Sequence, residues 1–259
     1  MALFDDQISF WRDRILAGAV HTFLSGAVAA LAGLLVFAVW YPFPYGELSG
    51  GRDLFFLVVS VDVVMGPLVT LAIFDRRKTW HVLRRDLQVI GLLQLVALGY
   101  GLWIVFAARP VHMVFEYDRF RVVHAIEIDR DLLDKAPSQL RALPLWGPTP
   151  IGLRPFVSES ERMEATVVAI QGVTLGARVD LWIPYDDVRT AILKEAKPIT
   201  KLLERRDSEL PRFESAARKS GLGLQSLLYL PLTGRKLFWT ALIDPVTADV
   251  VATVPVDPY

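Results

Sequence analysis

Three long apolar runs dominate the first 108 residues of the chain. Residues 15–45 contain no Asp, Glu, Lys or Arg, residues 54–74 contain the single charge Asp62, and residues 87–108 contain none. About 20 apolar residues in a helix cross a hydrocarbon layer of about 30 Å. The pattern therefore predicts a transmembrane domain over residues 21–108, with helices at about 21–40, 54–74 and 87–108.

The basic residues of the short connections predict how these helices are oriented. The loop 75–86 carries five Arg and Lys residues, whereas the loop 42–53 carries only Arg52. Loops rich in Lys and Arg stay on the cytoplasmic side. We therefore expect residues 1–20 to form a cytoplasmic, amphipathic segment with Phe4 and Ile8 among its apolar positions. The chain after residue 109 would lie on the outer side.

Residues 109–259 have a different pattern, in which short β-rich runs alternate with helical ones. The run 111–117 is separated from 120–128 by two residues, and Asp244-Pro245 separates two of the last runs, as in hairpins. Ser158 followed by Glu161 is a helix-start signal, and Pro198 should kink or split the helical stretch 186–206. We predict a periplasmic α+β domain with a mainly antiparallel sheet.

Composition excludes several kinds of chemistry. The chain has no cysteine and a formal net charge of zero, so thiolate metal sites and a basic nucleic-acid surface are not expected. It lacks a phosphate-binding glycine loop and the common hydrolase motifs. His112 and His124 lie on opposite arms of a predicted hairpin, but no third metal ligand can be named. We expect no enzymatic activity, no metal and no cofactor.

Asp62 is the one charged side chain that falls inside a predicted span. It would lie about 12 Å below the outer edge of the membrane, where an Asp costs about 2.5–3.5 kcal/mol. Gly66-Pro67 follows one turn later, and Pro67 would leave the Val63 carbonyl without a donor. Tyr100 lies at a similar depth and is the expected hydrogen-bond partner of Asp62. The alternative is that Asp62 contacts a polar group on the transmembrane helix of a partner.

Small residues follow one another at four-residue spacing in the first span. Ser25, Ala29 and Gly33 would share one face of the helix, and small residues let transmembrane helices approach closely. This face is expected to serve either packing within the bundle or the docking of a partner helix.

Several blocks of the sequence form a recognisable pattern: Trp40 to Pro44 (WYPFP), 61–70 (VDVVMGPLVT), 85–88 (RDLQ), Gln94, Tyr100-Gly101, and 109–111 with 118–120. They resemble the TfpX/TfpZ family of type IV pilin accessory proteins. Met65 departs from the Leu expected there. The resemblance is dense from about residue 20 to 128, and near the C-terminus only residues 242–245 and their flanks support it. It implies a bacterial inner-membrane protein with a periplasmic domain that helps a pilin to be assembled, without catalytic residues.

The leading hypothesis is therefore a non-enzymatic accessory factor for type IV pilus biogenesis. It would bind or chaperone its cognate pilin, major or minor, through the membrane bundle and the periplasmic domain. Other pilus assembly components are possible further partners, and lipid surrounds the bundle. A membrane-bound sensor or regulator is the alternative, and it would need a separate output partner because the cytoplasmic segments are short.

Overall fold

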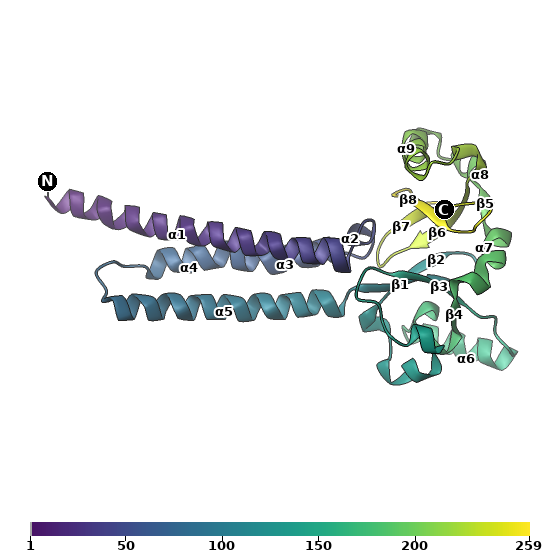
Figure 1. Ribbon diagram of the computed structural model, residues 1–259, viewed down its shortest axis with the longest axis horizontal. Helices are drawn as coiled ribbons and strands as arrows, with labels where there is room; N and C mark the ends of the chain where they lie inside the picture. Colours follow the sequence, from purple (N-terminus) through teal and green to yellow (C-terminus); the bar gives the residue numbers. More distant parts are fainter. Residues whose placement is uncertain (1) are drawn as a thin grey trace. The chain divides into compact units, whose positions relative to one another are not determined.

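The computed structural model describes residues 2–259, with side chains from residue 10 onward. The side chains of Phe4 and Ile8, on which the predicted amphipathic segment partly rests, lie outside the described residues. The chain forms two compact units: a helical unit of residues 2–39 with 52–107, and a C-terminal unit of 108–259 joined by 40–51 (Figure 1).

The helical unit consists of three long helical stretches. Helix α1 (Ala2–Leu35) runs into a π-helical turn, Val36–Trp40. The second stretch is made of α3 (Gly51–Ser60), the π-helical segment Val61–Met65 and α4 (Gly66–Ile73), and the third is α5 (Trp80–Ala107).

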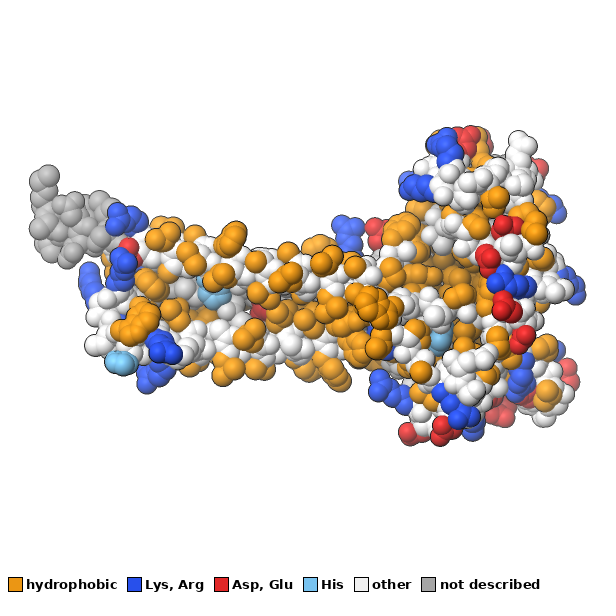
Figure 2. Space-filling model, viewed as in Figure 1, with side chains coloured by type: hydrophobic (Ala, Val, Ile, Leu, Met, Phe, Trp, Pro, Cys, Tyr) orange, Lys and Arg blue, Asp and Glu red, His pale blue; other side chains and the backbone are white. Residues whose placement is uncertain are grey.

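Within the described residues, three helical stretches are long and apolar enough to cross a membrane: Phe10–Trp40, Gly51–Ile73 and Trp80–Ala107. The first extends further toward the N-terminus than the sequence pattern predicts. Hydrophobic side chains cover the visible face of these helices, as expected for a surface in lipid (Figure 2). The fold therefore fits a membrane protein.

The C-terminal unit is built on an eight-stranded sheet with the order β4-β3-β1-β2-β6-β7-β8, and β5 pairs with β6. The strands are β1 (Pro110–Phe115), β2 (Phe120–His124), β3 (Thr149–Leu153), β4 (Trp182–Pro184), β5 (Lys197–Pro198), β6 (Leu228–Thr233), β7 (Phe238–Ile243) and β8 (Val250–Val254).

The sheet is mixed, which corrects the expectation of a mainly antiparallel one. The pairs β1–β3 and β2–β6 are parallel, whereas the hairpins β1–β2, β6–β7 and β7–β8 are antiparallel. Turn signals predicted the hairpins because both strands are close in sequence. The parallel junctions join strands separated by long connections, and no local pattern specifies that pairing.

Helices pack against both faces of this sheet. Alternation along the strands sends Leu230 and Ala241 to one face, against α7 (Arg189–Glu195), and Tyr229 and Leu242 to the other. The second face packs at its β8 end against α8 (Ile199–Leu203) and α9 (Leu210–Ser220). The predicted helix 186–206 is split by β5, which contains Pro198, so that expectation is confirmed.

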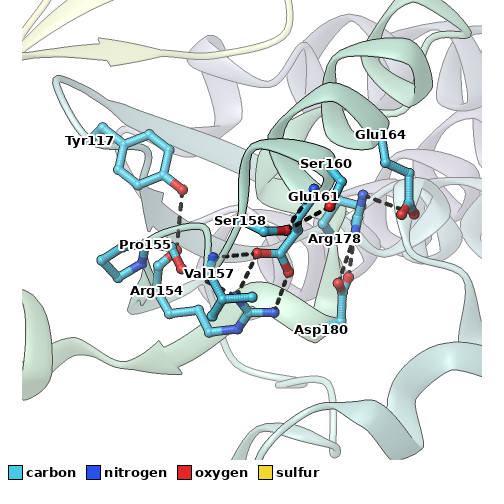
Figure 3. A network of polar contacts seen from close by, with 10 residues as sticks. All are labelled: Tyr117, Arg154, Pro155, Val157, Ser158, Ser160, Glu161, Glu164, Arg178 and Asp180. Carbon is cyan, nitrogen blue, oxygen red and sulfur yellow. Dashed lines mark hydrogen bonds and ion pairs between the residues drawn. The ribbon is translucent and has the colours of Figure 1, made fainter.

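A polar network fastens helix α6 (Glu159–Ile170) to the end of β3 (Figure 3). The Ser158 hydroxyl accepts a hydrogen bond from the Glu161 N–H at 3.1 Å, which confirms the predicted helix start. The Glu161 carboxylate accepts from the Val157 N–H at 2.7 Å and from Arg154 at 2.7 and 3.1 Å. Arg154, followed by the Val157 N–H, holds the pKa of Glu161 below its usual range.

The segment 40–51, which links the first two apolar stretches, belongs to the C-terminal unit. It contains the short helix α2 (Tyr45–Leu48). Leu48 is 1% exposed and lies in the same core cluster as Leu232 and Trp239. Its carbonyl accepts the Arg235 N–H at 3.2 Å, and the Tyr45 hydroxyl contacts Met113 Sδ at 3.6 Å. The sequence had suggested only a loop of the membrane domain here.

Candidate functional site

The π-helical segment leaves one carbonyl inside the helical unit without a backbone donor. In a π-helix, the N–H of each residue bonds to the carbonyl five residues earlier, and Pro67 has no N–H to donate. The carbonyl left without a backbone donor in this register is that of Asp62. It accepts a hydrogen bond from Gln94 Nε2 on α5 at 3.2 Å. The π register thus moves the affected carbonyl from Val63, as an α-helix would have it, to Asp62.

The amide of Gln94 connects this carbonyl to a histidine on α1. Gln94 Oε1 lies 2.7 Å from His21 Nε2, and His21 Nδ1 lies 2.6 Å from the hydroxyl of the buried Thr70 on α4. The amide oxygen can only accept, so His21 Nε2 is the donor to Gln94. Side chains from all three helical stretches are thus joined.

Gly66 is required for this cluster to close. A β-carbon at residue 66 would overlap the Gln94 amide, and it would lie 2.8 Å from Gln94 Cδ and 3.1 Å from His21 Nε2. We expect Gly66→Ala to displace Gln94 and to lower the stability of the helical unit by about 1–2 kcal/mol, since interhelical hydrogen bonds in membranes contribute about 0.6 kcal/mol on average and up to about 1.7.

Unfolding in mixed micelles by a denaturing detergent measures this loss. Gly99→Ala is the matched control, because a β-carbon there meets nothing within 4 Å. It should leave the midpoint unchanged or raise it, because alanine is the better helix former. Equal effects of the two substitutions would contradict the close approach at Gly66.

A groove with a volume of about 910 Å³ lies within the helical unit, over this cluster. It follows α1 from Arg12 to Ala29, a length of about 26 Å at 1.5 Å per residue. Its walls are mainly apolar, and polar groups occur along part of its length. These polar groups are His21, Ser25, Asp62, Thr70 and Gln94. Arg12, Asp13 and Arg76 lie at one end, where Arg76 and Asp13 form an ion pair at 3.2 Å. Such a groove is suited to an apolar helix that carries a polar group.

Three of the residues selected from the sequence line the groove: Ser25, Ala29 and Asp62. Gly33 instead packs against the ring of Phe55, with 3.1 Å between the site of a β-carbon and Cζ. The small-residue face is thus divided between groove and packing. Pro67 lies at the start of α4 and acts through the backbone, as described above.

Tyr100 does not bond to Asp62. Its side chain is 63% exposed and stacks on Trp103, with ring centroids 6.0 Å apart. The expected Asp62–Tyr100 hydrogen bond is absent from the described part of the chain. The half-buried Asp62 carboxyl lines the groove, and the Asp62 carbonyl is the group that enters the polar cluster.

Sequence reasoning did not predict that His21, Thr70 and Gln94 meet in one cluster. A usable signal was present, because each is a hydrogen-bonding side chain within an apolar stretch. In hydrocarbon such groups seek each other across helices. Which of them meet depends on helix rotation, which the spacing along one helix does not determine.

Outside the groove, the two histidines of the predicted hairpin have separate partners. His112 Nδ1 lies 2.8 Å from the Thr149 hydroxyl, and His124 Nδ1 lies 2.8 Å from Glu127 Oε1. Among the residues that the structure describes, no group of three His, Cys, Asp or Glu side chains is placed to hold a metal ion.

The helices and the groove thus define a class of protein, one with three candidate membrane spans and an α+β domain. Comparison with known proteins is more specific. The family model described as Fimbrial assembly protein FimB matches residues 9–50. The fimbrial assembly protein of Dichelobacter nodosus serogroup I is 34% identical over 242 residues, which covers 93% of this chain and 94% of that protein.

Two further relatives from Dichelobacter nodosus agree. The fimbrial assembly protein of serogroup E1 is 33% identical over 243 residues, with 93% of this chain and 94% of that protein covered. That of serogroups C1 and C2 is 42% identical over 118 residues, covering 46% of this chain and 88% of that protein. None of the solved structures matches the chain. The chain belongs to the family of fimbrial assembly proteins.

Proposed function

We propose that this protein is a non-enzymatic accessory factor of type IV fimbrial biogenesis, and that its groove receives the apolar helix of a fimbrial subunit, the pilin. Its relatives are fimbrial assembly proteins, and two of them match this chain along nearly their whole length. In this proposal the protein helps its pilin to be assembled, as members of the TfpX/TfpZ family, which its sequence resembles, do for their pilins. The protein itself is a component of the bacterial inner membrane.

The observation that carries the proposal is the groove beside α1. Its length of about 26 Å is close to the hydrocarbon thickness of about 30 Å that a single transmembrane helix crosses. Its apolar walls suit the side chains of such a helix, while Ser25 and Ala29 leave room for a close approach. A pilin helix held there would be kept from non-specific association until it is passed to the growing fimbria.

The half-buried carboxyl of Asp62 gives this groove a means of selection. A partner helix with a hydrogen-bond donor at the same depth would satisfy the carboxyl, whereas a wholly apolar helix would leave it unpaired in a dry site. An unpaired polar group in such a place is costly.

We propose that the N-terminus is cytoplasmic and the C-terminal domain periplasmic, as the distribution of Arg and Lys in the loops predicts.

Filling the groove tests this function. We expect Ala29→Trp to reduce co-purification of the full-length protein with its pilin by about tenfold, the equivalent of about 1.4 kcal/mol, and to reduce piliation. Leu31→Trp is the matched control, because Leu31 is on the same helix, 69% exposed and outside the groove lining. Pilin capture that survives Ala29→Trp and Leu31→Trp equally well would refute the groove as the binding site.

Asp62 is tested separately with two substitutions. Asp62→Asn keeps a polar side chain, and Asp62→Leu removes it. If Asp62 selects a polar partner group, the Leu variant captures less pilin than the Asn variant. Unchanged capture and piliation in both would remove Asp62 from pilin recognition.

A further inference from the structure

The strand β8 forms one edge of the sheet and is poorly protected there. It pairs with β7 alone among the described strands, and its sequence, Val-Val-Ala-Thr-Val, contains no charge, glycine or proline. Natural proteins usually shorten such edges or place charges and prolines on them. The opposite edge follows that rule, since β4 has three residues and ends at Pro184. The free edge of β8 is thus open to another strand.

A groove of about 940 Å³ within the C-terminal unit runs along this edge. Every residue from 250 to 255 lines it, which at about 3.3 Å per residue gives a track of about 17 Å. Phe43, Tyr45, Met113 and Tyr185 supply aromatic and thioether surface, and the Phe43 side chain is 76% exposed. The groove therefore offers an unpaired backbone edge beside an apolar wall.

Helix α9 gives the same groove a positive charge. Arg212, Ser215, Ala216 and Lys219 line it at a spacing that puts them on one face of the helix. Arg212 forms an ion pair with Glu209 at 3.0 Å, whereas Lys219 has no ion pair within the described residues. The one acidic side chain in the lining, Asp249, is bound to Arg189 at 2.6 Å. An incoming carboxylate would thus face Lys219 and Arg212.

We propose that an extended, acidic segment of the fimbrial subunit binds along β8 as an added strand, with its carboxylates against Lys219 and Arg212. Backbone hydrogen bonds to the strand edge supply affinity in this mode of recognition, and side chains at alternate positions supply specificity. A second copy of this chain fits less well. If two β8 edges paired, two identical basic faces of α9 would lie beside the same pair of strands. The inference rests on the proposed function and adds a second contact on the same client.

Photo-crosslinking in cells tests it directly. A benzophenone amino acid replaces Thr253 of the full-length protein, which is produced together with the fimbrial subunit. We expect a crosslink to the subunit from position 253 and none from position 157 in the loop before α6, where Val157 is 81% exposed and outside the groove lining. A crosslink from position 253 to a second copy of this chain would overturn the proposal in favour of self-association.

Charge reversal supplies an independent measurement. Lys219→Glu should lower the crosslinking yield from position 253 about tenfold, whereas Arg218→Glu on the same helix should not, because Arg218 lies outside the lining and pairs with Glu214 at 3.9 Å. Equal yields in the two variants would refute the acidic segment.

The outcomes separate this inference from the proposed function. If the fimbrial subunit co-purifies with the protein but does not crosslink from position 253, the strand-addition site fails and the groove of the helical unit stands. If the subunit neither co-purifies nor crosslinks, both proposals fail.

Discussion

Lowering the pH from about 6.5 to 4 is expected to reduce the unfolding free energy of the C-terminal unit by about 3 kcal/mol through His112 alone. His112 is 1% exposed, and burial lowers the pKa of its imidazole from 6.5 to about 4. Well above pH 6.5 the imidazole is neutral in both the folded and the unfolded chain, so it does not change the unfolding free energy. Between pH 6.5 and 4 the unfolded chain binds a proton at His112 and the folded chain does not. Each unit of difference between the two pKa values lowers the unfolding free energy by about 1.36 kcal/mol.

Denaturant unfolding of the full-length protein in mild detergent, followed by tryptophan emission, measures this loss. Trp182 is a local reporter, because its ring lies 4.7 Å from that of His112. His112→Gln removes the titrating group, so it should flatten the dependence between pH 4 and 6.5 by up to about 1.36 kcal/mol per pH unit, whatever it does to stability at neutral pH. An unchanged slope in this variant would show that another group is responsible.

Gly234→Ala is expected to lower the stability of the C-terminal unit by about 2–3 kcal/mol, near the upper end for overpacking. A β-carbon at Gly234 would overlap the carbonyl oxygen of Leu48 and lie 2.7 Å from Leu48 Cδ1. A backbone oxygen cannot rotate away as a side chain can, so residues 40–51 would have to leave the β6–β7 turn. This would also expose Leu48, which is otherwise buried.

Denaturant unfolding compares this variant with Gly223→Ala in the same unit. A β-carbon at Gly223 meets only the Ser226 hydroxyl, at 3.9 Å. The control should therefore remain close to the original stability, and proteolysis within 40–51 should accelerate only in Gly234→Ala. Unaltered stability and proteolysis of Gly234→Ala would contradict the packing of this segment in the domain core.

The features that could be predicted from the sequence are those encoded locally. The three apolar stretches are visible as long runs whose only charged residue is Asp62. The split at Pro198 follows because proline has no N–H to donate. The start of α6 at Ser158 depends on residues three apart. Each of these follows from neighbours along the chain, so no knowledge of distant contacts was needed.

The features that were missed depend on distant parts of the chain. The pairing of β2 with β6 joins residues about a hundred positions apart, and turn chemistry carries no information about it. The role of Gln94 depends on the rotation of α5 toward the π-helical segment, and depth alone suggested Tyr100 instead. Likewise, Leu48 is one apolar residue in a short loop, and only the domain core that receives it explains its burial.

The most direct test of the central claim is photo-crosslinking from four positions on α1 in cells that produce the fimbrial subunit. Ser25 and Ala29 line the groove, whereas Phe23 and Leu31 are 77% and 69% exposed and lie outside its lining. We predict that benzophenone at positions 25 and 29 crosslinks to the apolar helix of the subunit, and that positions 23 and 31 yield lipid adducts or none. Crosslinks to the subunit that are equal at all four positions, or confined to 23 and 31, would contradict the account.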